Sequence, residues 1–257
     1  MTGKLRGTAL AGWVLLVVAV CARAEPLSPR EMVAQADAQM RGETARGIYA
    51  MTITTPDWER TLRLRFWEDA ANDRAFVRVL SPPKEEGSAS LKLGNEMWTY
   101  LPEVERSMKI PPSMMAQSWM GSDFTNEDIV NSDDYVDEYE HALVDTAVLD
   151  STPVYVIESI PRPGAPVVWG KIRYYARRSD YLPVLQEYYD EDGSKVRHMS
   201  FARFRTIDGR VIPTLYAVEP LTEDEAGHRT ELLIEEIDID VDLPGGVFTR
   251  ANLERAR

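Results

Sequence analysis

The side chains that usually carry catalysis are few and scattered in this sequence. Its three histidines, His141, His198 and His228, show no metal-ligand spacing. The letters "SPPK", Ser81 to Lys84, match the nucleophile motif of penicillin-binding enzymes, but the two prolines prevent the helix on which that motif depends. These residues therefore predict neither a nucleophile with its base nor a metal centre.

Carboxylates are abundant but poorly placed for chemistry. The acidic segment "DDYVDEYEH", residues 133–141, lacks the alternating oxygen ligands and the glycine of a calcium-binding loop, which favours a solvated acidic surface. Glu103 and Glu105 are two apart on an expected strand and so share one face, but nothing near them supplies a nucleophile or an oxyanion hole. We expect no catalytic residue, no metal, no cofactor and hence no enzyme.

The first residues predict export. The segment "MTGKLRGTALAGWVLLVVAVCARA", residues 1–24, combines Lys4 and Arg6 with an apolar run and a small-x-small ending, Ala22 to Ala24, which is the pattern of a cleaved signal peptide. A bilayer span needs about 20 apolar residues, roughly twice the length of this run. We therefore expect cleavage after Ala24 rather than a membrane anchor.

Cleavage would leave an acidic exported protein without cysteine. The leader carries three of the 29 Lys and Arg residues and none of the 42 Asp and Glu, so the net charge changes from −13 to −16. Such a charge disfavours nucleic acid and anionic membrane surfaces as partners. The only cysteine, Cys21, follows bulky Val20 rather than the small residue of a lipidation signal, and its removal leaves no disulfide. The mature chain, residues 25–257, has no linker or repeat, so we expect a single domain.

One helix is expected at the start of the mature chain, and strands almost everywhere after it. Ser28 and Glu31 form a capping-box pattern, Pro29 suits the first helical position and Gly42 the end. The strand candidates, about eleven, are "GIYAMTITT", "RTLRLRFWED", "RAFVRVL", "SASLKLG", "EMWTYL", "PVYVIESI", "KIRYYAR", "PVLQEYYD", "VRHMSFARFRTI", "RVIPTLYAVEP" and "RTELLIEEIDID". Their pattern predicts one long, curled antiparallel sheet.

Alternation and turn residues support that sheet. In "RTLRLRFWED" the apolar Leu62, Leu64 and Phe66 alternate with Arg63 and Arg65, which places the two groups on opposite faces. The pairs Gly94-Asn95, Asp192-Gly193 and Asp208-Gly209 supply the positive φ angles of tight hairpins.

The segment "KIPPSMMAQSWMGSDF", residues 109–124, is unusually rich in soft apolar side chains for so acidic a chain. Pro111-Pro112 ends a strand, Ser113 can cap a short helix and Gly121 can end it. Methionine suits apolar partners that change shape, because it is unbranched and polarizable. Composition alone favours a helix that plugs the core, and a helical lid over Ser113 to Met120 is the alternative.

Several segments together resemble the LolA-like outer-membrane lipoprotein-sorting proteins, in the broader branch found beside export permeases. The central segment "GNEMWTYLPEVERSMKIPPSMMAQSWMGSDFTNEDI", residues 94–129, carries most of the resemblance. "LPVLQEYYDEDGSKVRHMSF", "GRVIPTLYAV" and "LPGGVFTRANLER" add to it. The resemblance implies a mainly β (α+β) fold: a curled antiparallel sheet forming an incomplete barrel, with helices over an apolar cavity that shields lipoprotein acyl chains in the periplasm.

The candidate cavity residues follow from this resemblance together with the strand and helix patterns. They are Leu62, Leu64 and Phe66 on one strand face, Trp98 and Tyr100 on another, and Met108, Met114, Met115, Trp119, Met120 and Phe124 in and around the lid. For the strand "EMWTYL" the sequence does not decide which face points inward, because Met97 and Leu101 on one face compete with Trp98 and Tyr100 on the other.

Two functions of different classes remain. In the first, the protein is a periplasmic carrier that encloses acyl chains of a lipoprotein or lipid and moves its methionine-rich lid. In the second, the same residues form a closed core and the acidic surface docks to an inner-membrane permease. Acyl chains are the partner in the first case and the permease in the second.

Overall fold

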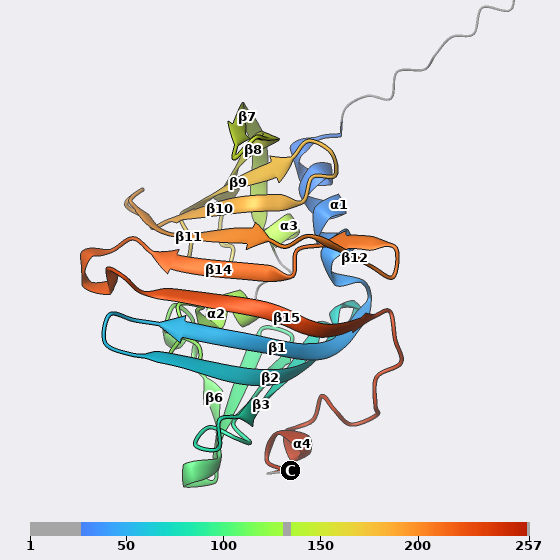
Figure 1. Ribbon diagram of the computed structural model, residues 1–257, viewed down its shortest axis with the longest axis vertical. Coiled ribbons are helices and arrows are strands. Elements are labelled where there is room, and N and C mark those ends of the chain that lie inside the picture. Colours follow the sequence, from blue (N-terminus) through green and yellow to red (C-terminus); the bar gives the residue numbers. More distant parts are fainter. Residues whose placement is uncertain (1–26, 131–134, 256–257) are drawn as a thin grey trace, which may run out of the picture.

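The computed structural model describes residues 27–130 and 135–255, so the expected signal peptide lies outside the described residues. Within them, a 13-stranded antiparallel sheet dominates (Figure 1). The sheet curls strongly but does not close into a barrel, which confirms the incomplete barrel expected from the sequence.

The sheet has two arms that meet along β1 and β15. The first arm is β1 (Thr44–Thr54), β2 (Glu59–Asp69), β3 (Arg74–Ser81), β4 (Ala89–Leu93), β5 (Glu96–Leu101) and β6 (Arg106–Ile110). The second arm is β7 (Tyr139–Leu149), β8 (Thr152–Pro161), β9 (Lys171–Arg177), β10 (Pro183–Tyr189), β11 (Lys195–Ala202), β14 (Leu215–Pro220) and β15 (Arg229–Ile239). The spatial order runs from β6 through β1, β15 and β14 to β7, so β6 and β7 are the two edges.

Two expected strands are each split. "VRHMSFARFRTI" divides into β11 and β12 (Arg205–Ile207) at Arg203, which has φ 53°, and "RVIPTLYAVEP" divides into β13 (Arg210–Ile212) and β14. The pair β12–β13 forms a separate hairpin whose turn, Asp208-Gly209, has positive φ at both residues. This turn agrees with its sequence pattern.

Alternation along β2 sets the two faces of the sheet. Leu62, Leu64 and Phe66 are at most 3% exposed and belong to the largest apolar cluster, on the concave side. Arg63 lies on the convex side, where its guanidinium Nε is 2.7 Å from a carboxylate oxygen of Glu235 on β15. The predicted polarity of this strand is confirmed.

The helix α1 (Pro29–Arg41) has the expected capping box between Ser28 and Glu31 and ends at Gly42, whose φ is 71°. Its buried residues are Met32, Val33 and Ala36, which pack with side chains of β8 and β9. Figure 1 shows α1 across the ends of the second-arm strands. The helix therefore covers one end of the curled sheet.

The chain between the two edges crosses the open side of the sheet. Residues 111–130, here called the strap, contain a 3₁₀ turn, η3 (Pro112–Met114), and α2 (Asn126–Val130); α3 (Tyr135–Glu138) then leads into β7. The helix expected over residues 113–120 is absent, and Pro111 rather than Ser113 occupies the N-cap of η3.

A folded-back turn replaces that expected helix. The backbone N–H of Trp119 donates to the carbonyl of Phe124, and those of Asn126 and Glu127 donate to residues 117 and 115. The reversal occurs at Met120 and Gly121, with φ values of 52° and 71°. Bonds across the turn satisfy the backbone groups that the helix would have used, so the helical prediction was wrong.

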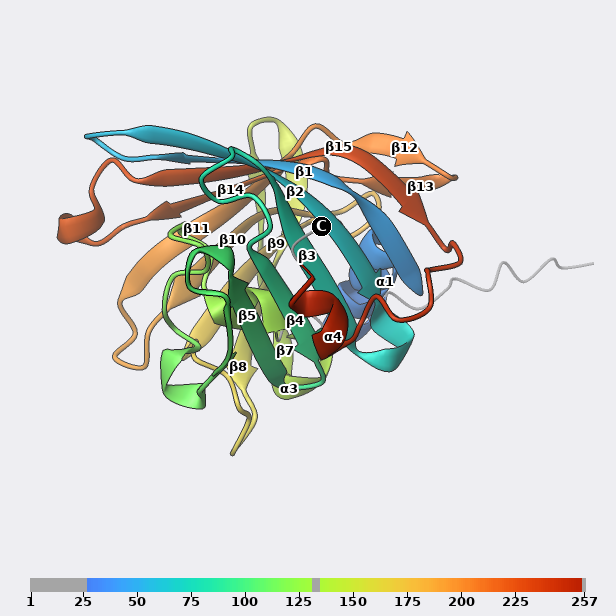
Figure 2. The ribbon, with the colours of Figure 1, turned by 90° about the horizontal axis from the view of Figure 1, so that it is seen from below.

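A C-terminal segment covers the convex side of the first arm. After β15 the chain runs to α4 (Arg250–Leu253), which lies against β4 (Figure 2). Val247 and Leu253 pack there with Phe76, Leu91 and Tyr100 in a second apolar cluster. Three further 3₁₀ turns lie in loops: η1 (Ala70–Asn72), η2 (Pro102–Val104) and η4 (Glu223–Glu225).

Candidate functional site

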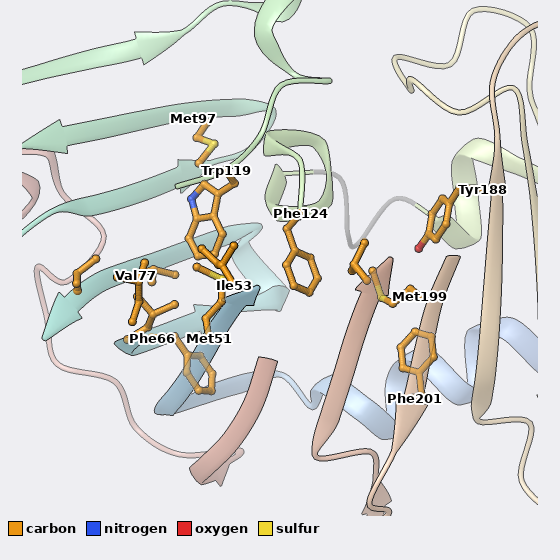
Figure 3. Packing of buried hydrophobic residues seen from close by; sticks show 14 of the residues in the cluster. Met51, Ile53, Phe66, Val77, Met97, Trp119, Phe124, Tyr188, Met199 and Phe201 are labelled. Carbon is orange, nitrogen blue, oxygen red and sulfur yellow. The ribbon is translucent and has the colours of Figure 1, made fainter. Parts of the chain in front are cut away.

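A cavity of about 320 Å³ lies between the two arms, beneath the strap and beside α1. Its lining comes from β1, β2 and β3 of the first arm, from β9, β10, β11, β14 and β15 of the second, and from the strap, α1 and α3. Apolar surface makes up most of the wall. Figure 3 shows Trp119 and Phe124 of the strap between Phe66 and Val77 on one side and Met199 and Phe201 on the other.

Strand alternation aims the first-arm residues inward. Phe66 lies in register with Gly47 on β1, and its ring stacks on Tyr49 with centroids 4.0 Å apart and an interplanar angle of 6°. A side chain at Gly47 would collide with its surroundings, because a Cβ there would lie 2.0 Å from the carbonyl oxygen of Glu236. Glycine at this position thus permits the tight approach of β1 and β15 beside the stacked rings.

The same alternation on β11 aims Met199 and Phe201 inward, and on β10 it does so for Tyr188. Phe201 meets Tyr216 of β14 edge to face, with ring centroids 5.3 Å apart. Aromatic and thioether groups therefore form the second-arm wall.

The strap is fixed to the first arm by two hydrogen bonds. The indole Nε1 of Trp119 donates to Ser90 Oγ on β4 at 3.1 Å, and the Arg60 guanidinium on β2 donates to the carbonyl of Met120 at 2.8 Å. Trp119 is only 5% exposed, and its indole forms part of the cavity wall.

A buried ion pair, here called the latch, joins the strap to the second arm. The guanidinium of Arg197 on β11 donates to both carboxylate oxygens of Asp128 on α2, with one N–O distance of 2.7 Å. Their side chains are 5% and 11% exposed. The rings of Trp169 and Tyr188 each lie 4.2 Å from the guanidinium carbon, so the cation is also held between two aromatic faces.

The cavity wall beside α1 is polar. Arg41 of α1 contacts the carboxylates of Asp37 at 2.7 Å and of Glu68 at 3.0 Å, so two anions flank one cation. Burial, and then the charge of Glu68, raise the pKa of Tyr49 well above its ordinary value. Burial also raises the pKa of Tyr216 to about 12. Both phenols are therefore neutral at physiological pH.

Three of the residues predicted from sequence line this cavity: Phe66, Trp119 and Phe124. Leu62 and Leu64 belong to the same apolar cluster but lie below the cavity surface. Among the strap residues, Met115 and Met120 are partly buried against the cluster.

The other four predicted residues lie elsewhere. Trp98 and Tyr100 face the convex cluster under the C-terminal segment, and Met97 takes the concave side of β5. Met108 and Met114 are 47% and 37% exposed. The choice of Trp98 and Tyr100 failed because both faces of β5 are covered, so alternation could not identify the inward one.

Sequence reasoning missed the second-arm wall and the contribution of α1. Met199 and Phe201 alternate in "VRHMSFAR", and this signal could have found them. No comparable alternation of apolar and polar side chains marks the strands that contain Tyr49, Tyr188 and Tyr216. The latch pair, Arg197 and Asp128, is far apart in sequence and gave no local signal.

One polar network beside the cavity was also unforeseen. Tyr135 of α3 and His141 of β7 both hydrogen bond to Ser159 Oγ on β8, at 2.7 Å and 2.8 Å, and His141 Nε2 is 3.2 Å from the carbonyl of Val136. Because Nε2 must donate to that carbonyl, Nδ1 accepts from the serine. Ser159 is fully buried, so the network joins α3 to the sheet rather than presenting a nucleophile. Residues 27–130 and 135–255 contain no group of three or more potential metal ligands.

A family model and several solved structures match this chain. A family model described as an uncharacterized protein matches residues 71–255, well over half of the chain. The chain belongs to this family. A DUF1329 family protein from Desulfovibrio piger is 25% identical, with a TM-score of 0.81 over 88% of this chain and 100% of that one. No curated protein matches the chain.

Two further solved structures share this fold. A Vibrio parahaemolyticus protein, described as an outer membrane lipoprotein-sorting protein domain, is 20% identical with a TM-score of 0.79 over 88% of this chain and 98% of that one. A LolA superfamily protein from Nitrosomonas europaea is 21% identical with a TM-score of 0.75 over 88% and 100%. The fold expected from the resemblance to LolA-like proteins is thereby confirmed. In residues 27–130 and 135–255, no helix is long and apolar enough to cross a bilayer.

Proposed function

We propose that this LolA-like protein is a non-catalytic periplasmic carrier that shields acyl chains of a lipoprotein or lipid between the inner and outer membranes. The observation that supports it most directly is the apolar cavity of about 320 Å³ between the two arms, under a strap that connects the sheet edges. Each methylene removed from water contributes about 0.8 kcal/mol, so ten would contribute roughly 8 kcal/mol before the entropic costs of binding.

The relatives give the proposal its biological setting. The Vibrio protein is described as an outer membrane lipoprotein-sorting domain, and we extend that role to this chain. The leader pattern of residues 1–24 supports transit through the periplasm. A permease-docking protein with a closed core is the alternative, and it gives no reason for a cavity lined by both arms.

We further propose that the strap acts as the lid of the cavity. Trp119 and Phe124 contact the ligand, and Met115 packs behind them against the same apolar cluster. Thioether side chains suit this position because they adapt to both a filled and an empty cavity. Leu62 and Leu64 support the floor.

The carrier proposal is tested by extracting lipid from protein purified from the periplasm without detergent and recording its mass spectrum. We expect acyl-containing species at close to one molecule per protein, and we expect 1-N-phenylnaphthylamine, a neutral fluorescent probe, to bind once they are removed. Protein that carries no lipid and binds no probe would favour the closed-core alternative.

The lid proposal is tested by two neighbouring methionines. Met115→Ala removes apolar contact behind the cavity wall and should weaken probe binding while changing the melting temperature of the empty protein little. Met114→Ala is the matched control, because Met114 is 37% exposed whereas Met115 is partly buried against the cluster. Should Met115→Ala lower the melting temperature strongly and leave probe binding intact, Met115 is simply part of the core.

A further inference from the structure

The charged groups of the cavity carry an inference that rests on the proposed carrier function. The wall beside α1 holds Arg41 between Asp37 and Glu68, and the wall beside the strap presents Asp128, whose ion-pair partner Arg197 lies outside the lining. The guanidinium of Arg41, which belongs to the described lining, therefore already has two carboxylate partners, and Asp128 adds a further carboxylate at the other end. An anionic group that entered the cavity would meet carboxylates and would have to displace one of them to reach a cation.

The two charged walls lie at opposite ends of the same strands. On β2, Arg60 bonds to the strap at the start of the strand, whereas Glu68 contacts Arg41 near its end. Figure 1 accordingly shows α1 and α2 toward opposite ends of the sheet. An amphiphile could enter in either orientation, but its head group would reach carboxylates at both ends.

We propose that the cavity selects ligands by charge: it accepts acyl chains whose head is uncharged, as in ester-linked or amide-linked lipids, and rejects free fatty acids. A neutral carbonyl or hydroxyl can accept from the phenols of Tyr49 or Tyr216, which keep their protons, without adding charge to the cavity. A carboxylate must lose its hydration and approach like charges in a poorly solvated space, which costs far more.

The test compares two amphiphiles with the same acyl chain, laurate and 1-monolauroylglycerol, as competitors of 1-N-phenylnaphthylamine at pH 7.5 and below their micelle concentrations. We expect laurate to compete at least about tenfold more weakly than the glycerol ester. Equal competition by the two amphiphiles in the wild-type protein would overturn the charge filter and leave the carrier function standing. Failure of both to displace a bound probe would instead count against both proposals.

A gain of function makes the test independent of folding defects. The double variant Asp37→Asn with Glu68→Gln removes two carboxylates from the cavity wall, so laurate should compete about tenfold better than it does in the wild type, while the glycerol ester changes little. The matched control is Glu236→Gln with Asp238→Asn, which changes the net charge equally at exposed positions. An equal gain in the control would reduce the effect to overall charge and overturn the inference. Should the double variant not fold, the wild-type comparison still decides the matter.

Discussion

At the residue scale, the alternation along β2 puts adjacent side chains into opposite surroundings. Leu64 is fully buried on the concave side, and Arg63 is half exposed on the convex side beside Glu235. A charge at the first position would have no partner, whereas removing the second breaks only an exposed ion pair. This contrast allows a matched pair of substitutions.

Leu64→Arg should destabilise the fold by several kcal/mol, because it buries an unpaired charge, and should abolish probe binding. Arg63→Ala should change both quantities little, since exposed ion pairs contribute little to stability. Urea unfolding and probe titration measure the two effects. Similar losses from the two substitutions would contradict the assignment of the faces.

His141 predicts how stability depends on pH. Burial lowers its pKa below the ordinary value, with the charges of Arg30 and Arg162 acting in the same direction, while its ring stays neutral to accept from Ser159 and to donate to Val136. A histidine with a lowered folded-state pKa stabilises the fold above its unfolded pKa of about 6.5, and this contribution decreases as the pH falls below that value.

The melting temperature of the wild type should therefore decrease from pH 7.5 to pH 5.5. The melting temperature of His141→Asn should decrease less over the same interval. Identical slopes in the wild type and in His141→Asn would show that His141 does not contribute to the pH dependence.

At the element scale, the strap is held to both arms by polar bonds rather than by helix formation. Arg60 and Ser90 bind it to the first arm, and Arg197 binds it to the second. Opening the cavity at the strap requires at least one of these sets to break. The latch is the stronger candidate for controlling this opening, because it is an ion pair with little exposure to water.

Asp128→Asn should cost about 3–5 kcal/mol, because it leaves the guanidinium of Arg197 buried without its counter-charge. The double substitution Arg197→Leu with Asp128→Leu should lower the free energy of unfolding by less than the sum of Arg197→Leu alone and Asp128→Leu alone, since it removes both charges together. Both proteins should release bound probe faster than the wild type in stopped-flow exchange. Additive losses with unchanged release would argue against a latch.

At the scale of the whole molecule, the seam between β1 and β15 joins the two arms into one sheet. Met51 pairs with Leu62 on one side and with Leu232 on the other, so a single strand serves both arms. The largest apolar cluster also contains residues of both arms. The arms thus share their core.

Because the arms share a core, we predict that residues 25–257 unfold as a single domain. Calorimetry should show one transition whose calorimetric and van't Hoff enthalpies agree. Two resolved transitions, or disagreement between the enthalpies, would indicate that the arms unfold separately.

Export is the second prediction at this scale. The Ala22-x-Ala24 pattern predicts that the mature protein begins at Glu25, and bulky Val20 disfavours lipidation of Cys21. N-terminal sequencing of protein from the periplasm gives the answer directly. An intact leader or an acylated Cys21 would exclude the soluble carrier in its proposed form.

The sequence by itself determined the capped helix α1, the curled antiparallel sheet, the faces of β2 and several hairpin turns. These features depend on neighbours close in the chain: Ser28 and Glu31 cap locally, and Leu62, Leu64 and Phe66 alternate within one strand. That alternation also supplied the cavity residue Phe66, and the resemblance carried mainly by residues 94–129 added the incomplete barrel and two further cavity residues, Trp119 and Phe124.

Only the tertiary structure decided the inward face of β5, the form of the strap and the charged ends of the cavity. Met97 faces inward because the distant C-terminal segment covers Trp98 and Tyr100. The strap folds back because its backbone bonds across a turn. Arg197 meets Asp128 from a strand 69 residues away, and Arg41 meets Glu68 from another element. Such contacts arise from long-range packing, which no local pattern of residues specifies.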